Sequence, residues 1–163
     1  MPTDGMRLVL LRHGEAERFA ACDEMRGLTQ RGRAEAQAAA QAIAALALPA
    51  PVVVASPYVR AQETAGIVAA VLGVGQVVIV TGITPDDDPR RALAVLGASC
   101  RPGMTVVAVT HMPLIGALMG LLLHGDVQDA PGIPTAGGGV FEGELIAPGL
   151  MRQRCPIRPE LRR

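Results

Sequence analysis

The chain has 163 residues, 50% of them hydrophobic and 18% charged, and its 15 Lys and Arg balance its 15 Asp and Glu. This length and composition predict a single domain over residues 1–163 with an aliphatic core, since domains commonly have ~100–150 residues. Two Phe, one Tyr and no Trp argue against stacking on nucleic-acid bases. The zero net charge argues against bulk attraction to nucleic acid or to a membrane surface.

The cysteine pattern indicates a reducing compartment. Cys22, Cys100 and Cys155 are far apart and form no Cys-x-x-Cys pair, which predicts neither a disulfide framework nor a zinc site. The N-terminal apolar run is too short for a signal peptide. The charge-free stretches 64–85 and 102–125 are broken by Gly, Pro, Gln or His, so we expect a cytoplasmic protein that does not enter a membrane.

Strand and helix signals alternate along the chain. The apolar run 7–11 predicts a buried strand followed by a polar loop over 15–28. Thr29 is a helix-capping residue type, and the Ala-rich stretch behind it predicts a helix to about residue 48. The other elements expected are strands at 52–55, 76–80, 105–110 and 139–146, helices at 58–72, 89–98 and 113–123, a loop at 126–137 and an irregular tail from residue 148. This alternation predicts an α/β three-layer sandwich with a mostly parallel central sheet flanked by helices.

Polar side chains follow three of the expected strands. Arg12 and His13 come after the first strand, Ser56 and Arg60 after the second, and His111 after a later one. Ligands of open α/β sheets bind outside the carboxyl ends of the strands, so these groups are expected to converge. A guanidinium fork matches phosphate oxygens, and an imidazole acts as a nucleophile or an acid/base. Each residue alone has an ordinary structural explanation, but together they favour phosphoryl chemistry.

Four blocks of sequence carry a family resemblance. They are residues 10–16 (LLRHGEA), 28–32 (LTQRG), 56–65 (SPYVRAQETA) and 109–113 (VTHMP). In this order they resemble the histidine phosphatase superfamily, which has the phosphoglycerate-mutase-like fold. Within it, the short length and the segments 83–85 and 111–116 look most like the small phosphohistidine phosphatases of the SixA type.

The resemblance implies roles for four residues. His13 would be the nucleophile, which accepts the phosphoryl group and then loses it to water. Arg12, Arg60 and His111 would hold the phosphoryl oxygens and stabilise the charge of the transition state. With these cationic groups in place, we expect neither a metal ion nor another cofactor.

Three further residues are candidates for contacts with the substrate. Arg26 lies in the loop after the nucleophile, where a solvated arginine is the ordinary alternative. Ser56 is expected either to hydrogen-bond His13 or to cap the following helix. Glu15 lies two residues after His13 and is also a candidate acid.

The general acid of the superfamily has no obvious counterpart. Many members carry a Glu or Asp on a segment that here reads TGITP, over residues 81–85, without an acid and without a lid insertion. Asp86, Asp87, Asp88 or Glu15 could replace it, although acids before a helix also interact with its N-terminus. A phosphorylated imidazole needs less help to leave than an alkoxide does.

The sequence therefore predicts a metal-independent phosphatase that acts on phosphohistidine of a partner protein, of the histidine phosphotransfer type. Two alternatives stay open. One is a phosphatase of small phosphomonoesters such as sugar phosphates. The other is a phosphoprotein-binding module with little turnover.

Overall fold

The computed structural model describes residues 4–161 and is built around a six-stranded sheet of order β3-β2-β4-β1-β5-β6. The strands are β1 (Met6–Arg12), β2 (Pro51–Ala55), β3 (Val77–Ile79), β4 (Thr105–Thr110), β5 (Gly138–Gly143) and β6 (Arg152–Ile157). The first four pair in parallel, whereas β5 pairs antiparallel with both β1 and β6. The expected mostly parallel sheet is confirmed.

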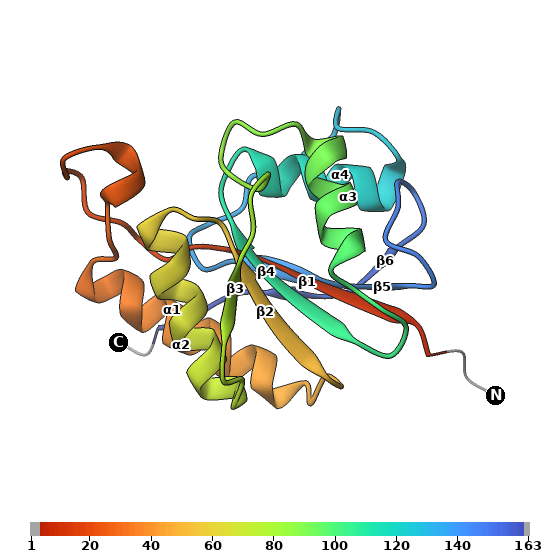
Figure 1. Ribbon diagram of the computed structural model, residues 1–163, viewed down its shortest axis with the longest axis horizontal. Coiled ribbons are helices and arrows are strands. Elements are labelled where there is room, and N and C mark those ends of the chain that lie inside the picture. Colours follow the sequence, from red (N-terminus) through yellow and green to blue (C-terminus); the bar gives the residue numbers. More distant parts are fainter. Residues whose placement is uncertain (1–3, 162–163) are drawn as a thin grey trace.

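Helices cover both faces of this sheet. They are α1 (Gln30–Ala45), α2 (Val59–Leu72), α3 (Pro89–Ala98) and α4 (Leu114–His124), and a short 3-10 helix, η1 (Asp23–Met25), follows β1. Figure 1 shows α1 and α2 on one side of the sheet and α3 and α4 on the other. Within residues 4–161, none of the helices is both long enough and apolar enough to cross a bilayer.

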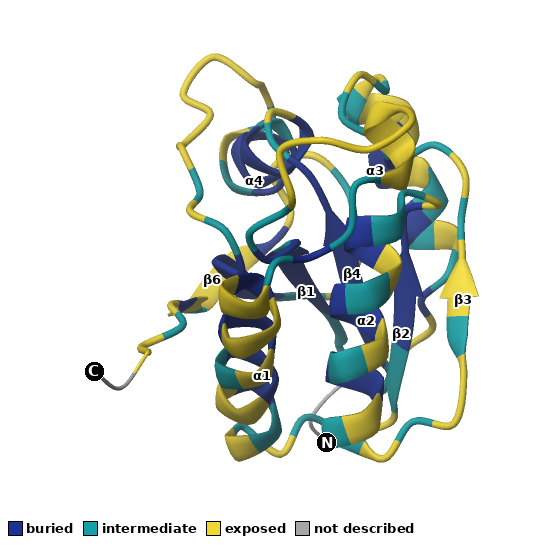
Figure 2. Ribbon diagram, turned by 90° about the vertical axis from the view of Figure 1, so that its left-hand side faces the viewer, coloured by how far each residue is buried: buried dark blue, intermediate teal, exposed yellow. Residues whose placement is uncertain are grey.

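The period-two alternation of β1 explains the two layers. Leu8 and Leu10 are fully buried in the core beneath α3 and α4, and Val9 and Leu11 in the core beneath α1 and α2. A central strand that is apolar on both faces has to be covered on both faces. In contrast to this strand, which is buried on both faces, helix α1 is buried only on the side that faces the sheet, and its outer side is exposed (Figure 2).

Capping residues determine where two helices begin. The side chain of Thr29 accepts a hydrogen bond from the amide of Gly32, and Asp88 does the same for Arg90 at the start of α3. The predicted helices are confirmed, although α1 ends at Ala45 rather than near residue 48.

The expectation of an irregular tail from residue 148 is wrong, because residues 152–157 form β6. This strand pairs only with β5, at the edge of the sheet, where its Pro156 removes no hydrogen bond to a second neighbour. Its remaining residues are mostly exposed and polar, so the sequence carried no strand pattern. β5 likewise ends at Gly143, before the expected residue 146.

Gly32 is required where the loop after β1 crosses the first turn of α1. A Cβ built on Gly32 would overlap the main-chain oxygen of Glu15, and one on Gly14 would overlap the carbonyl of Gly32. We therefore expect Gly32→Ala to lower the free energy of unfolding by at least about 2 kcal/mol, because two backbones must move apart.

Gly66 is the matched control, since it also lies within a helix but, apart from its chain neighbours and its own helix backbone, no described atom lies within 4 Å of the position that a Cβ would take there. Gly66→Ala is expected to raise the free energy of unfolding by about 0.5–1 kcal/mol through helix propensity. Urea denaturation measures both variants. Effects of the same sign would contradict the close approach at Gly32.

Candidate active site

Three neighbouring strands deliver polar side chains to one edge of the sheet. Arg12 ends β1 and is followed by His13, Ser56 follows β2, and His111 follows β4. Because β2, β4 and β1 are adjacent and parallel, their carboxyl ends lie together. The imidazole ring centroids of His13 and His111 are 5.1 Å apart.

His13 is held in one tautomer. Its Nδ1 lies 2.7 Å from the carbonyl oxygen of Gly14, which can only accept, so Nδ1 carries the hydrogen. Its Nε2 receives a hydrogen bond from Nε of Arg60 at 3.3 Å. Nε2 therefore presents a lone pair toward the guanidinium group.

Burial and neighbouring cations keep both imidazoles neutral. His13 is 6% exposed; burial, together with the charges of Arg60 and Arg12, lowers its pKa to about 4, against a smaller opposing effect of the Gly14 carbonyl. His111 is 1% exposed, and burial, followed by the effects of His13 and Arg60, lowers its pKa to about 3. At neutral pH the two rings are therefore uncharged.

These low pKa values predict that the fold loses stability in mild acid. The ordinary pKa of histidine is 6.5, so the unfolded chain binds protons before folded His13, at about 4, or His111, at about 3. The histidine contribution to the free energy of unfolding is complete above the unfolded pKa and falls as the pH drops from 6.5 toward 4.

Urea denaturation at about pH 7 and about pH 5 measures this loss. A variant with His13→Gln and His111→Gln should lose less stability between the two pH values than the wild type. An equal loss in both proteins would contradict the depressed pKa values.

His111 is positioned by Ser56 and Tyr58. Its Nε2 lies 2.7 Å from Oγ of Ser56, and that oxygen also accepts the amide hydrogen of Tyr58 at 3.3 Å. The Tyr58 ring meets His111 edge-on, with centroids 5.0 Å apart. Among the described residues, Nδ1 of His111 is buried without a hydrogen-bond partner. Of the two alternatives expected for Ser56, the hydrogen bond to His13 is absent, whereas the bond from the Tyr58 amide places Ser56 at the start of α2. Its contact with His111 was not expected.

The guanidinium groups of Arg12 and Arg60 form hydrogen bonds with residues that lie outside the strands of the sheet. Nη1 of Arg12 donates to the carbonyl of Ile133 at 2.7 Å, in the loop before β5, while its buried Nε has no partner among the described residues. Arg60, in the first turn of α2, is 3% exposed. Its Nη1 donates to the main-chain oxygen of Asp23 at 2.8 Å and its Nη2 to Oδ2 of Asp23 at 3.1 Å.

Arg26 and Glu15 lie differently with respect to these groups. Arg26 donates through Nε to Oδ1 of Asp23 at 2.8 Å, so it is connected to Arg60 by a shared carboxylate. The Glu15 side chain instead accepts a hydrogen bond from the Thr29 hydroxyl at 2.9 Å, at the start of α1. The structure therefore links Arg26 to Arg60 through Asp23 and directs Glu15 toward α1.

The three consecutive aspartates build the turn before α3. Asp87 accepts hydrogen bonds from the amide and the hydroxyl of Thr84, both at 2.7 Å, and Asp88 accepts from the amide of Arg90 at 2.9 Å. Asp86 is exposed. Two of these carboxylates are thus engaged in local structure.

Sequence reasoning missed Asp23, Thr64 and Glu35. Oγ1 of Thr64 accepts from the amide of Gly14 at 3.1 Å and donates to the carbonyl of Arg60 at 2.8 Å, which connects the loop after β1 to α2. Thr64 follows Arg60 by one helical turn, and this spacing was the available signal.

Glu35 is buried and connects two loops. Its Oε1 accepts from the amide of Glu15 at 2.8 Å, and its two carboxylate oxygens contact the hydroxyl of Thr135 at 3.1 and 2.9 Å. A lone Glu within an Ala-rich helix gave no sign of this. Across residues 4–161, no three His, Cys, Asp or Glu side chains are close enough together to hold a metal ion.

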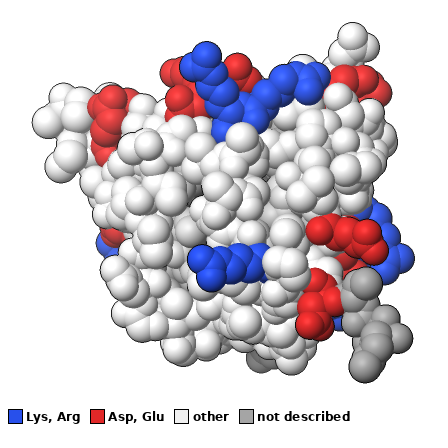
Figure 3. Space-filling view, turned by 45° about the vertical axis from the view of Figure 1, so that its right-hand side comes forward, with Lys and Arg blue, Asp and Glu red and all other residues white. Residues whose placement is uncertain are grey.

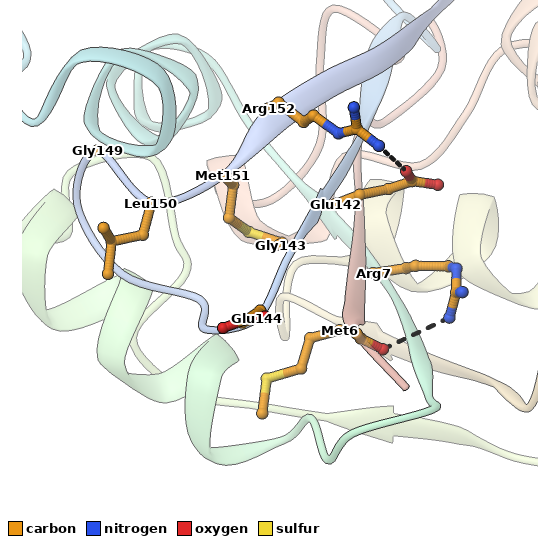
Figure 4. A pocket seen from close by; sticks show the side chains of 10 residues that line it. Met6, Arg7, Glu142, Gly143, Glu144, Gly149, Leu150, Met151 and Arg152 are labelled. Atoms are coloured by element: carbon orange, nitrogen blue, oxygen red, sulfur yellow. Dashed lines mark hydrogen bonds and ion pairs between the residues drawn. The ribbon is translucent and has the colours of Figure 1, made fainter. Parts of the chain in front are cut away.

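A separate hollow of about 560 Å³ lies at the opposite end of β1. Met6, Arg7, Glu142 and Arg152 are among its lining residues, and Glu142 and Arg152 approach to 3.6 Å (Figure 4). The hollow lies at the Met6 end of the seven-residue strand β1 and the imidazole pair lies beyond its Arg12 end, so the two are roughly 20 Å apart. On the face shown in Figure 3, basic and acidic side chains lie in mixed groups, without an extended field of one sign.

The site thus combines guanidinium groups with a neutral imidazole whose Nε2 lone pair faces Arg60, an arrangement suited to receive a phosphoryl group. Residues 8–85 match the family model of the histidine phosphatase superfamily (branch 1). Over 123 residues the chain is 30% identical to the phosphohistidine phosphatase SixA of Escherichia coli K12, covering 74% of this chain and 76% of that protein. The chain belongs to the histidine phosphatase superfamily, and it is a phosphatase.

Solved structures agree with this assignment. The protein histidine phosphatase SixA complexed with tungstate is similar with a TM-score of 0.83 and 26% identity, over 94% of this chain and 97% of that one. A mycobacterial glucosyl-3-phosphoglycerate phosphatase, at 22% identity, shares the fold with a TM-score of 0.67 over 93% and 98% of the two chains. The resemblance seen in the sequence blocks is thereby confirmed.

Proposed function

We propose that this phosphatase hydrolyses phosphohistidine on a partner protein, without a metal ion, through a phosphohistidine intermediate on His13. The observation that carries the proposal is the lone pair of His13 Nε2, which is directed toward Arg60 in a buried, neutral ring. A protonated imidazole would have no electron pair to offer, so the low pKa keeps the nucleophile available at neutral pH.

The reaction has two steps. In the first, Nε2 of His13 attacks phosphorus, and the bond between phosphorus and the substrate nitrogen breaks with its electrons staying on the substrate imidazole, which leaves as a neutral ring because its other nitrogen carries a proton. In the second, water attacks phosphorus, the bond to His13 breaks, and inorganic phosphate leaves. Arg12, Arg60 and His111 surround the transferring group and stabilise its charge.

The surroundings of the carboxylates favour a substrate with a good leaving group. Asp87 and Asp88 are engaged in the turn before α3. Partial burial raises the pKa of the Asp23 carboxyl, but hydrogen bonds from Arg26 and Arg60 outweigh it and hold that pKa below its usual value. Asp23 is therefore an anion at neutral pH and has no proton to give to an alkoxide. The SixA relatives named above are phosphohistidine phosphatases, which agrees with this choice of substrate.

Phosphate release tests the proposal, with EDTA present, on a histidine-phosphorylated phosphotransfer protein, on para-nitrophenyl phosphate and on a sugar phosphate. We expect the highest kcat/KM on phosphohistidine and the lowest on the sugar phosphate. Faster turnover of the sugar phosphate would make the protein a small-molecule phosphatase. Binding of all three substrates without turnover would make it a phosphoprotein-binding module.

A further inference from the structure

We propose that Asp23 is a positioning residue of this site, which holds one end of the Arg60 guanidinium so that its side edge faces the phosphoryl group on His13. The inference rests on the proposed function, because it requires a phosphoryl group at Nε2 of His13. Asp23 belongs to none of the four sequence blocks that resemble the superfamily; it lies between the first two of them.

The hydrogen bonds of Arg60 divide its donors into two sets. A guanidinium is a rigid plane with five N–H donors, in which Nη1 and Nη2 form the end and Nε and Nη2 form one side. Asp23 binds the end of the guanidinium: its main-chain oxygen accepts from Nη1 at 2.8 Å, and its Oδ2 accepts from Nη2 at 3.1 Å. Nε, on the side edge, points at Nε2 of His13 at 3.3 Å.

Asp23 uses only one of the two hydrogens of Nη2. In the planar guanidinium the other one lies parallel to the hydrogen of Nε. The Nε hydrogen points at Nε2 of His13 and the Nη2 hydrogen points beside it, so both donors face the side of the ring on which Nε2 would carry a phosphoryl group. Two parallel N–H donors match two phosphoryl oxygens, which is the bidentate geometry that makes an arginine specific for phosphate. Rotation of the guanidinium about its long axis would destroy the match, and the two bonds to Asp23 oppose that rotation.

Asp23 also connects Arg60 to Arg26. Its Oδ1 accepts a hydrogen bond from Nε of Arg26 at 2.8 Å, while its Oδ2 accepts one from Nη2 of Arg60. Nη1 of Arg26 in turn donates to the carbonyl of Glu17 at 2.9 Å, which closes the segment 17–27 on itself. Figure 1 shows this segment projecting beyond the sheet, and its residues 17–25 are exposed. The carboxylate of Asp23 is thus a link between a projecting loop and a buried arginine.

A different role for Asp23 predicts the opposite result. If its carboxylate occupied the place of a phosphoryl oxygen, it would compete with the ligand, and removing it would tighten oxyanion binding. If it positions Arg60, removing it weakens binding, even though one negative charge has been taken from an anion-binding site. The sign of the change in affinity therefore decides between the two roles.

The experiment measures tungstate binding by calorimetry and turnover of para-nitrophenyl phosphate, for Asp23→Ala, Asp23→Asn and Asp23→Glu. Asn offers one oxygen acceptor in place of two, and Glu keeps both. We expect kcat/KM and tungstate affinity to fall about 10- to 100-fold in Asp23→Ala, to fall less in Asp23→Asn, and to recover in part in Asp23→Glu. The matched control is Glu24→Ala, which removes the same charge from the neighbouring exposed residue of η1 and should change neither value more than about twofold.

Tungstate affinity that is unchanged or tighter in Asp23→Ala would overturn the proposal, as would equal losses in Asp23→Ala and Glu24→Ala. Asp23 is 54% exposed, so these variants should keep the wild-type thermal midpoint, and that measurement separates positioning from a loss of folding. The binding experiment does not depend on turnover. It therefore tests Asp23 even if phosphohistidine proves not to be the substrate.

Discussion

Replacing His13 by alanine is expected to lower kcat by about 10⁵-fold or more, since no other described side chain offers a lone pair at the same point between Arg60 and His111. In the proposed mechanism, removal of the covalent nucleophile closes the two-step route altogether, whereas removal of a charged neighbour only slows it. The loss should be similar on phosphohistidine and on para-nitrophenyl phosphate, because both reactions would pass through the proposed intermediate on His13.

Phosphate release and quenched-flow labelling with a radioactive substrate measure this effect. The wild type should retain a label that acid releases and alkali does not, as is expected of a phosphorylated nitrogen, and His13→Ala should retain none. His124→Ala is the matched control, because this histidine is exposed at the end of α4 and should be dispensable. A label that persists in His13→Ala would assign the nucleophile elsewhere.

The strand ends could be predicted because local patterns are informative there. A short apolar run that stops at a charged or polar residue identifies both a buried strand and the side chains at its end, as at Arg12 and His111. Alternation of such runs with helices then indicates a parallel sheet. No long-range information was needed for this part of the fold.

The order of the strands could not be predicted from the same patterns, and this explains why the contact between Ser56 and His111 was not expected. In the sheet, β4 lies between β2 and β1. A residue that follows β2 therefore meets the end of β4 before that of β1, so Ser56 reaches His111 and not His13. Strand order results from the packing of the whole sheet, and the sequence around Ser56 does not contain it.

The contact between Asp23 and Arg60 was unpredictable for a different reason. It joins two residues that are 37 positions apart, and the Asp23 segment has neither a helical nor a strand period. Only its spacing of three residues from Arg26 was visible, and that spacing is common in solvated turns. Interactions of irregular loops depend on where the loop is carried by its flanking elements, which here are β1 and α1.

Arg60→Lys is expected to lower kcat by about 10³-fold, nearly as much as Arg60→Ala, although lysine keeps the charge. The ammonium group is a single point, so it cannot face Nε2 of His13 and hold Asp23 with separate, parallel donors as the guanidinium does. Steady-state kinetics on para-nitrophenyl phosphate measure the loss.

The matched control is Arg33→Lys, at an exposed arginine that pairs with Glu63, where the effect on kcat should stay within about twofold. If Arg60→Lys kept activity within threefold of the wild type, charge alone would hold the phosphoryl group. Neither the planar guanidinium of Arg60 nor the hydrogen bonds by which Asp23 orients it would then contribute to catalysis.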